Sequence, residues 1–437
     1  MSALEQTWPR SVITDLVAWS LRLVLSSLQA LIAAPSFLFL LTLGLMLFHP
    51  PVLSFAPYDR FAFGLLVAVV LLRILACKHP IRIGGPVTWP LLGLLLLALG
   101  GVLTQPYTCE AWSVFAAKWL VPFALFHFAA YVFVAEADLR RFELFSLLVL
   151  AYLCFVSICF LCDLRALIFP KFILDENLGI HADRARGPFL QAVANGLALN
   201  LLGLLALDSF RRKKLRGVLA FVLLAAIPIA ILATKTRAVW LSFAGSIVAL
   251  AFFSRDRRTR KVCLCVIAAS SLALGAMLLT TSHHQSMSDR LEEEGPVYFR
   301  MAVYQAGWEM FLSKPILGWS APQMQAELYR RISEFRQDEY YFHNTFLEIL
   351  VQHGLLGLSL YLWVMVDLFR LGTKRSHDPC SSSFLDAGFR SLWPLILLVY
   401  LVNASFVVMN YQFVNGLLFS LAGILNAQNL RSDLNGN

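Results

Sequence analysis

Long apolar runs, separated by short polar clusters, fill almost the whole chain. Each of the twelve runs is close to the roughly 20 residues that a helix needs to cross a bilayer. Only helices and closed barrels satisfy their backbone in lipid, and the runs lack the alternation of barrel strands. The pattern predicts an all-α, polytopic membrane protein of about 12 transmembrane helices, at 35–49, 60–77, 87–104, 112–134, 142–162, 190–208, 216–233, 238–254, 261–280, 345–369, 391–408 and 411–427.

Two segments between the runs are too long to be turns. One is a shorter loop near residues 163–191, and the other is a large loop over residues 282–342. The N-terminal stretch from residue 11 to 34 lacks a cleavage site and reads as an interfacial helix. The expected division is a cytoplasmic or interfacial segment (1–34), helices 1–9 (35–281), the large periplasmic loop (282–342), helices 10–12 (343–427) and a cytoplasmic tail (428–437).

Basic residues orient the expected helices. If the N-terminus is cytoplasmic, every strong basic cluster in a short loop falls on the cytoplasmic side, as the positive-inside rule requires. Both termini are then cytoplasmic and the two long loops lie outside. This use of the basic residues explains the net charge of +9 without nucleic acid, so none is expected as a partner. The clusters are Lys78 with Arg82, Arg140 with Arg141, residues 211–216, residues 255–261 and residues 370–375.

Composition and missing motifs narrow the possible functions. At 59% hydrophobic and 14% charged residues, the chain is too apolar for soluble domains. Its eight cysteines show neither metal-finger spacing nor a disulfide framework, and Cys159 and Cys162 favour a helix face over a redox pair. The nucleotide-binding G-x-x-x-x-G-K-[ST], the D-x-D, the H-E-x-x-H and the G-x-S-x-G motifs are all absent. We therefore expect no metal site and no cofactor.

Five cations break the positive-inside pattern by falling on the outer side. An arginine at membrane depth is costly unless it is compensated, and its planar fork suits paired hydrogen bonds to phosphate oxygens. A lipid-linked pyrophosphate would supply that partner. Any single cation can instead reach lipid headgroups or pair with the glutamates at 292–294. Several together beside helix ends favour a binding site, made of Arg184, Arg186, Lys235, Arg237 and Arg300.

His343 is the candidate for proton transfer. It stands with Asn344 where the large loop enters the next apolar run, and Glu348 follows one helical turn after Asn344. A neutral imidazole at this place can take a proton from an acceptor hydroxyl, although a histidine beside an asparagine is also a common helix cap. Glu348 lies inside an apolar run, where a carboxylate indicates a functional site. Apart from Glu348 and Lys118 the expected spans are nearly free of charge.

Four pieces of the chain, in order, resemble the O-antigen ligase and polymerase superfamily. Residues 234–238 resemble its T-x-[TS]-R-[AG] sequence, and residues 300–318 its arginine helix ended by P-x-x-G. His343 and Asn344, followed after nine residues by Gly354 and Gly357, resemble its H-[NSQ]-x9-G-x-x-G signature. Residues 186–195 resemble a looser R-x-G-x-F pattern with a later asparagine. The likeness covers about residues 184–358.

The resemblance implies a bacterial inner-membrane glycosyltransferase that acts at the periplasmic face without metal or nucleotide. The donor would be a glycan on undecaprenyl pyrophosphate and the acceptor the lipid A core. Arg237 and Arg300 would hold the leaving pyrophosphate, with His343 as base, and a single displacement would invert the anomeric carbon. Arg184, Arg186, Lys235, Asn344 and Glu348 are expected to contact the donor.

One departure leaves the branch of the superfamily open. Ligases often carry a second histidine two residues before the catalytic one, and Tyr341 stands there. An O-antigen or exopolysaccharide polymerase and a protein O-oligosaccharyltransferase share much of the signature. From other classes, a transporter would use the outer cations as a vestibule, and a scaffold would not need them.

Overall fold

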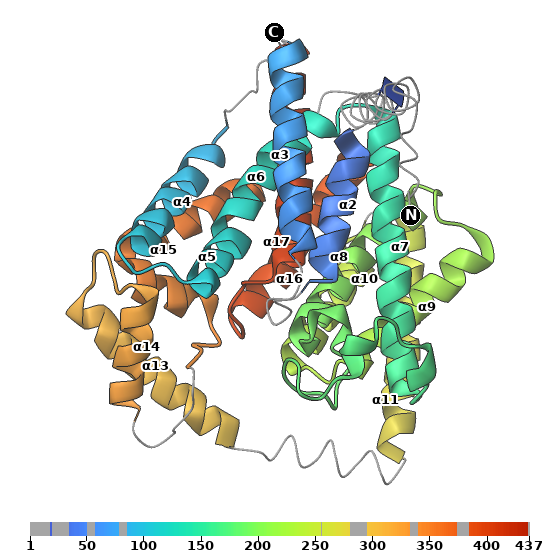
Figure 1. The fold of residues 1–437 in the computed structure, drawn as a ribbon. Coiled ribbons are helices and arrows are strands. Elements are labelled where there is room, and N and C mark those ends of the chain that lie inside the picture. The colour runs from blue at the N-terminus through green and yellow to red at the C-terminus, as the bar shows by residue number, and fades with distance from the viewer. Residues whose placement is uncertain are drawn as a thin grey trace, which may run out of the picture.

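The computed structural model describes residues 18–19, 35–49, 57–77, 85–254, 256–279, 295–332, 340–373 and 384–435. Within these ranges the elements are helices and there is no strand (Figure 1). The all-α prediction is therefore confirmed. The interfacial helix expected over residues 11–34 lies outside the described residues except for positions 18 and 19, as do parts of the large loop at 280–294 and 333–339.

Each of the twelve apolar runs coincides with helical structure, because a helix satisfies its backbone hydrogen bonds locally, and Pro228 and Pro394 are tolerated inside two of them. The first six runs correspond to α2 (Pro35–Leu47), α3 (Tyr58–Cys77), α4 (Thr88–Leu103), the continuous α5 (Cys109–Phe115), η1 (Ala116–Leu120) and α6 (Val121–Val132), α7 (Glu136–Leu161) and α8 (Ala192–Arg211). The others correspond to α9 (Gly217–Ala233), α10 (Arg237–Phe253), α11 (Arg257–Leu279), α15 (Thr345–Thr373), α16 (Ala387–Ala404) and α17 (Gln412–Asn435).

Only some of these helices are long and apolar enough to be classed as membrane spans. In the described part of the chain, four helices are long and apolar enough, namely Cys109–Val132, Glu136–Leu161, Ala192–Arg211 and Thr345–Thr373. Five more are apolar but shorter, among them α2, α4, α9 and α10. The count of twelve spans thus remains a prediction.

Helix α8 lies at the centre of the bundle. From Ala192 to Ser209, all its side chains except Val193 are buried. Around it the helices approach closely at small residues, as is usual in membrane bundles. On α17, a Cβ atom at Gly423 would lie 2.0 Å from the Phe126 carbonyl oxygen of α6. At Gly196 of α8, a Cβ atom would lie 2.5 Å from Val239 of α10.

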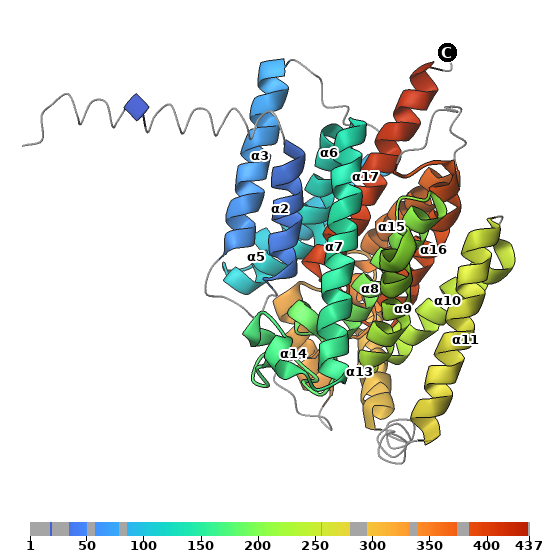
Figure 2. The same cartoon turned by 90° about the vertical axis from the view of Figure 1, so that its right-hand side faces the viewer.

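The two ends of the bundle differ in their polar contacts. At one end, Arg212 on α8 donates to Glu143 on α7 at 2.6 Å, and Arg211 bonds to Asp386 at the start of α16. Arg141 near the start of α7 and Arg216 just before α9 lie at this end too. At the other end, α13 (Gly295–Ser313) and α14 (Ala321–Arg331) form a short layer, farthest from the end of α17 (Figures 1 and 2).

The two long loops are structured where they are described. In residues 163–191 three short 3-10 helices cover Arg165–Leu167, Lys171–Leu174 and Gly187–Phe189. The described part of the large loop forms α13 and α14, and α13 ends at Ser313, just before the expected stop at Pro315. That the large loop is periplasmic remains a prediction.

Candidate functional site

A backbone joint connects α13 to α15. Helix α15 is broken at Gly354, where φ is 62° and ψ is −163°. The break leaves the carbonyl of Val351 and the amide of Leu355 without a hydrogen-bond partner inside the helix. The Val351 carbonyl accepts from the Trp319 amide at 2.8 Å, and the Leu355 amide donates to the Pro315 carbonyl at 2.8 Å. The P-x-x-G and G-x-x-G pieces of the sequence are therefore the two halves of one joint.

Helix α13 lies against the segment that carries His343. A Cβ atom on Gly307 would lie 2.5 Å from the Phe342 ring, so only glycine allows this approach. The Tyr304 hydroxyl donates to the His343 carbonyl oxygen at 3.5 Å, at the limit of a hydrogen bond. One turn earlier on the same helix, Arg300 is half-buried and its charge acts on His343. The structure thus brings Arg300 and His343 together, as the sequence predicted.

The surroundings of His343 keep its imidazole neutral. The residue is half-buried and its backbone is left-handed, with φ at 49°. Burial lowers the pKa of His343 below the usual 6.5, and the charges of Arg300 and His181 lower it further. A histidine with a lowered pKa is deprotonated at neutral pH and can accept a proton.

Asn344 caps the helix that follows His343. Its side-chain oxygen accepts from the amides of Phe346 at 3.0 Å and Leu347 at 3.1 Å. These two amides are among the unsatisfied donors at the start of a helix, and an asparagine is a preferred cap for them. The cap fixes where α15 begins and therefore where His343 stands.

Thr345 fastens this helix start to the turn between α16 and α17. Its hydroxyl donates to the Val407 carbonyl at 2.7 Å and accepts from the Met409 amide at 3.0 Å. From the same turn, the Tyr411 hydroxyl donates to the Gln191 side chain at 2.5 Å, just before α8. The turn between α16 and α17 thus holds the starts of α15 and α8 together, although Tyr411 and Gln191 are 220 positions apart in the sequence.

Arg186 holds its own loop together. Its Nε donates to the Ile173 carbonyl at 3.1 Å, and its two terminal nitrogens donate to the carbonyls of Leu178 and Asp175. The residue is 1% exposed. These hydrogen bonds make Arg186 an internal staple that shapes residues 173–186, and the predicted contact of Arg186 with the donor stays a prediction.

The same loop is attached to α8 and to the end of α9, just before α10. A Cβ atom on Gly187 would lie 2.7 Å from the Asn195 side-chain oxygen, and the Asn195 amide donates to the Ala185 carbonyl at 2.8 Å. The Ala185 amide in turn donates to the Ala233 carbonyl at 3.1 Å. Residues 184–186 therefore lie beside residues 233–237, so the structure brings Arg184 near the segment with Lys235 and Arg237.

Three of the predicted cations remain accessible in this region. Arg237 is exposed at the first position of α10, and Lys235 is half-buried with a left-handed backbone, φ 46°. Arg184 is half-buried, and its Nε lies 3.9 Å from a carboxylate oxygen of Asp183. Side chains placed in this way can reach an anion at the bundle end.

His181 is a site residue that the sequence did not indicate. Its carbonyl accepts from the Arg184 amide at 3.1 Å, and its side chain is exposed and close enough for its charge to act on His343. His181 therefore connects the loop of Arg184 with the His343 side of the site. The available signal was a histidine three residues before Arg184 in an outer loop, and no spacing rule selects it.

Glu348 is directed away from these cations. It is 8% exposed, and its Oε2 accepts from the Lys118 ammonium at 2.5 Å. Its other carboxylate oxygen accepts from the Gln352 side chain at 3.3 Å, and its contact with the donor stays a prediction. In the ranges that the structure describes, no group of three or more histidine, cysteine, aspartate or glutamate side chains is placed to hold a metal ion.

The strongly apolar helices of the bundle define a helical membrane protein. At one end of the bundle, this protein carries cations around a neutral histidine. Residues 219–362 match the family model described as O-antigen ligase. The match runs from α9 into α15, includes Arg237, Arg300 and His343, and confirms the resemblance to the O-antigen ligase superfamily. The family indicates a glycosyltransferase of the ligase or polymerase type. No curated protein matches the chain.

Proposed function

We propose that this protein is an O-antigen ligase, which transfers a glycan from undecaprenyl pyrophosphate to the lipid A core during lipopolysaccharide biosynthesis. The observation that carries the proposal is the position of His343. It is half-buried beside Arg300 and His181, with its pKa lowered, at the bundle end where Arg184, Lys235 and Arg237 also lie. A neutral base beside anion-binding cations is what transfer from a pyrophosphate donor requires.

In this mechanism His343 takes the proton from a hydroxyl of the lipid A core as its oxygen attacks the anomeric carbon. The bond from that carbon to the pyrophosphate breaks, and the electron pair leaves with the pyrophosphate. Arg237 and Arg300 stabilise the charge that develops on the leaving group, without metal or nucleotide. One direct displacement inverts the anomeric carbon.

The remaining predicted residues have supporting roles in the proposal. Arg184 and Lys235 bind the donor, and Asn344 contributes its amide group, since its carbonyl oxygen already caps α15. Arg186 acts indirectly by shaping the loop that presents Arg184.

We place the protein in the bacterial inner membrane, with both termini in the cytoplasm and the site in the periplasm. The separation of charge along the bundle supports this orientation. Arg141, Arg212 and Arg216 lie at the end opposite the site, and basic residues favour the cytoplasmic side. Arg212 is paired with Glu143 and Asp208, and Arg141 is paired with Asp138 at 2.7 Å, so Arg216 carries more of this argument.

The banding pattern of lipopolysaccharide tests the proposal. A strain without the gene is complemented with the wild type, with Arg237→Ala, Arg300→Ala or His343→Ala, and with Arg140→Ala as a control. Arg140 is exposed at the opposite end, and its ion-pair partner in the described part of the chain is Glu136 one turn away, at 3.2 Å. We expect the deletion to leave bare core and accumulate lipid-linked polymer, with the ladder restored by the wild type and the control alone.

Other banding patterns of the lipopolysaccharide would indicate one of the alternative functions. Core that carries one repeat unit identifies a polymerase of the same superfamily, and an unchanged ladder directs attention to an exopolysaccharide or to a protein acceptor. Full activity of all three site variants contradicts glycosyl transfer at this site and favours a transporter.

A further inference from the structure

Lys118 and Glu348, two of the charged residues within the expected spans, are partners. They lie 230 positions apart in the sequence, and the ammonium nitrogen is 2.5 Å from the carboxylate oxygen Oε2. Lys118 is 7% exposed and Glu348 is 8% exposed. Removing two charges from water inside a membrane protein carries a large desolvation cost, which pairing offsets only with good geometry. The pair therefore calls for a function.

The helix that carries Lys118 changes its geometry there. Between α5 and α6, residues 116–120 form a π-helix, which inserts one extra residue into a turn and redirects the side chains around it. Lys118 also lies 5.5 Å from the centroid of the Trp119 ring, and Trp119 contacts the His353 ring of α15 edge-on at 5.9 Å. The π-turn thus directs Lys118 and Trp119 toward α15.

On the other side, Glu348 belongs to the first turn of α15. Its amide donates to the Asn344 carbonyl at 3.0 Å, and its second carboxylate oxygen accepts from Gln352 at 3.3 Å. Asn344 caps the same turn and follows His343 directly. The ion pair consequently joins the π-turn to the backbone that carries His343.

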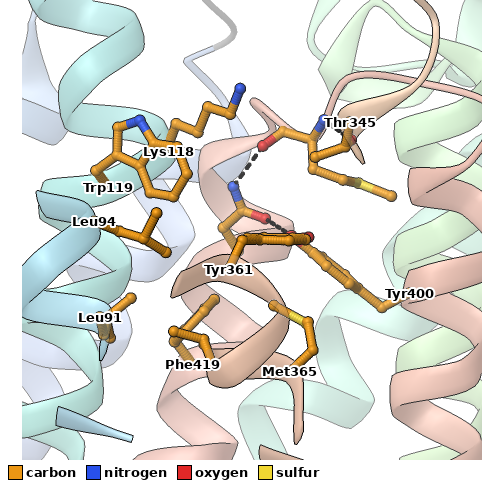
Figure 3. A pocket seen from close by; sticks show the side chains of 12 residues that line it. Leu91, Leu94, Lys118, Trp119, Thr345, Tyr361, Met365, Tyr400 and Phe419 are labelled. Carbon is orange, nitrogen blue, oxygen red and sulfur yellow. Dashed lines mark hydrogen bonds between the residues drawn. The ribbon is translucent and has the colours of Figure 1, made fainter. Parts of the chain in front are cut away.

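The space beside the pair excludes a direct role in substrate binding. Lys118 and Trp119 lie on one side of a small cavity, Thr345 at its upper edge, and Tyr361 and Tyr400 below (Figure 3). Its volume is about 20 Å³. A site that holds one water needs about 10 to 15 Å³ on this measure, so neither a sugar nor a pyrophosphate fits.

Stability alone does not account for the pair either. Buried ion pairs can often be replaced by apolar side chains of similar volume with little or no loss of stability, whereas removing one partner strands the other charge. What apolar side chains do not reproduce is a fixed geometry between two specific atoms on two helices.

We propose that Lys118 is a positioning residue for the transfer reaction. Through its ion pair with Glu348 it fixes the first turn of α15 and, through that turn, the orientation of His343 toward the acceptor hydroxyl. The inference rests on the proposed function, because it assigns Lys118 a task in the reaction of His343.

Four variants of the full-length purified protein test this role: Lys118→Met, Glu348→Gln, the double variant Lys118→Met with Glu348→Leu, and the exchange Lys118→Glu with Glu348→Lys. The measurements are kcat, KM for the lipid-linked donor, and thermal unfolding. Arg140→Met, at an exposed ion pair, is the matched control. A misplacement of about 1 Å can cost up to about 100-fold in rate.

We expect the apolar double variant to unfold like the wild type while its kcat falls about 10- to 100-fold at an unchanged KM. The exchange, which restores the pair in reverse, should recover part of that loss. A double variant with wild-type kcat overturns the proposal, as does an exchange variant no better than the folded double variant. If His343→Ala is itself fully active, the proposed function fails instead, so the two failures are distinguishable.

Discussion

Gly318 and Gly354 meet backbone to backbone at the joint between α13 and α15. A Cβ atom on Gly318 would lie 2.7 Å from the Gly354 nitrogen, and one on Gly354 would lie 2.2 Å from the Ile316 carbonyl oxygen. Both residues have a left-handed backbone, with φ at 70° and 62°. The distance between Arg300 on one helix and His343 at the start of the other depends on this contact.

We expect Gly354→Ala to disrupt the joint. The side chain meets backbone atoms that cannot rotate away, and the left-handed conformation adds strain of about 1–3 kcal/mol for a residue other than glycine. Helix α13 then moves away from α15, and transfer falls by about 100-fold. The measurement is kcat of the purified variant together with its thermal unfolding.

Gly245→Ala is the control for this substitution. Gly245 lies within α10 with no atom within 4 Å of its Cβ position, and alanine favours a helix over glycine by about 1 kcal/mol. It should keep full activity and unfold no earlier than the wild type. Wild-type activity in Gly354→Ala contradicts a role of the joint in the reaction.

The lowered pKa of His343 predicts the direction in which the rate of transfer changes with pH. The neutral form acts as base, and burial, Arg300 and His181 all lower the pKa from its ordinary 6.5. Activity should therefore be complete at neutral pH and fall as the pH drops through the lowered pKa, with the midpoint of this acid limb below pH 6.5. A profile of kcat/KM against pH reports it. A midpoint above pH 6.5 would show that the neutral imidazole of His343 is not the base.

His181→Gln should move that acid limb upward. Removing the charge of His181 removes the third cause of the lowered pKa, while burial, the first cause, and Arg300 remain. The midpoint should rise without reaching that of a free histidine. His49→Gln is the control, because His49 contacts Asp59 at 3.2 Å and is not among the causes of the lowered pKa of His343. An unshifted profile in His181→Gln places His181 outside the site.

The sequence predicted the helices of the fold and indicated most residues of the candidate site because those features are local. An apolar run forms a helix wherever it stands, and Pro315 ends α13 as expected. The family motifs identified Arg237, Arg300 and His343 because each motif lies within one short segment. These residues meet at one end of the bundle because successive helices run antiparallel. This arrangement places the two long loops on the same side.

What the sequence could not provide are contacts between distant segments. The partner of Glu348 is Lys118, and neither has a spacing that points to the other. Apolar helices give little indication of which face meets a neighbour, because lipid and protein interior are equally apolar. His181 also belongs to no motif, so the sequence alone did not indicate that it lies near His343. A cation in a motif, such as Arg186, looks the same whether its donors point at a ligand or at its own loop.

Arg186 and Arg237 should therefore respond differently to substitution. Arg186→Lys replaces the three nitrogens of a planar guanidinium with one ammonium nitrogen, which cannot reproduce the geometry of all three carbonyl contacts. Because hydrogen bonds to charged groups contribute about 1.5–3 kcal/mol each, we expect a destabilisation of about 3 kcal/mol. Arg237→Ala removes an exposed side chain and should leave unfolding unchanged while transfer is lost. Thermal unfolding and kcat of the folded protein separate the two effects. An unchanged unfolding temperature in Arg186→Lys rules out the staple, and an equally large destabilisation in Arg237→Ala argues against Arg237 as a ligand of the pyrophosphate.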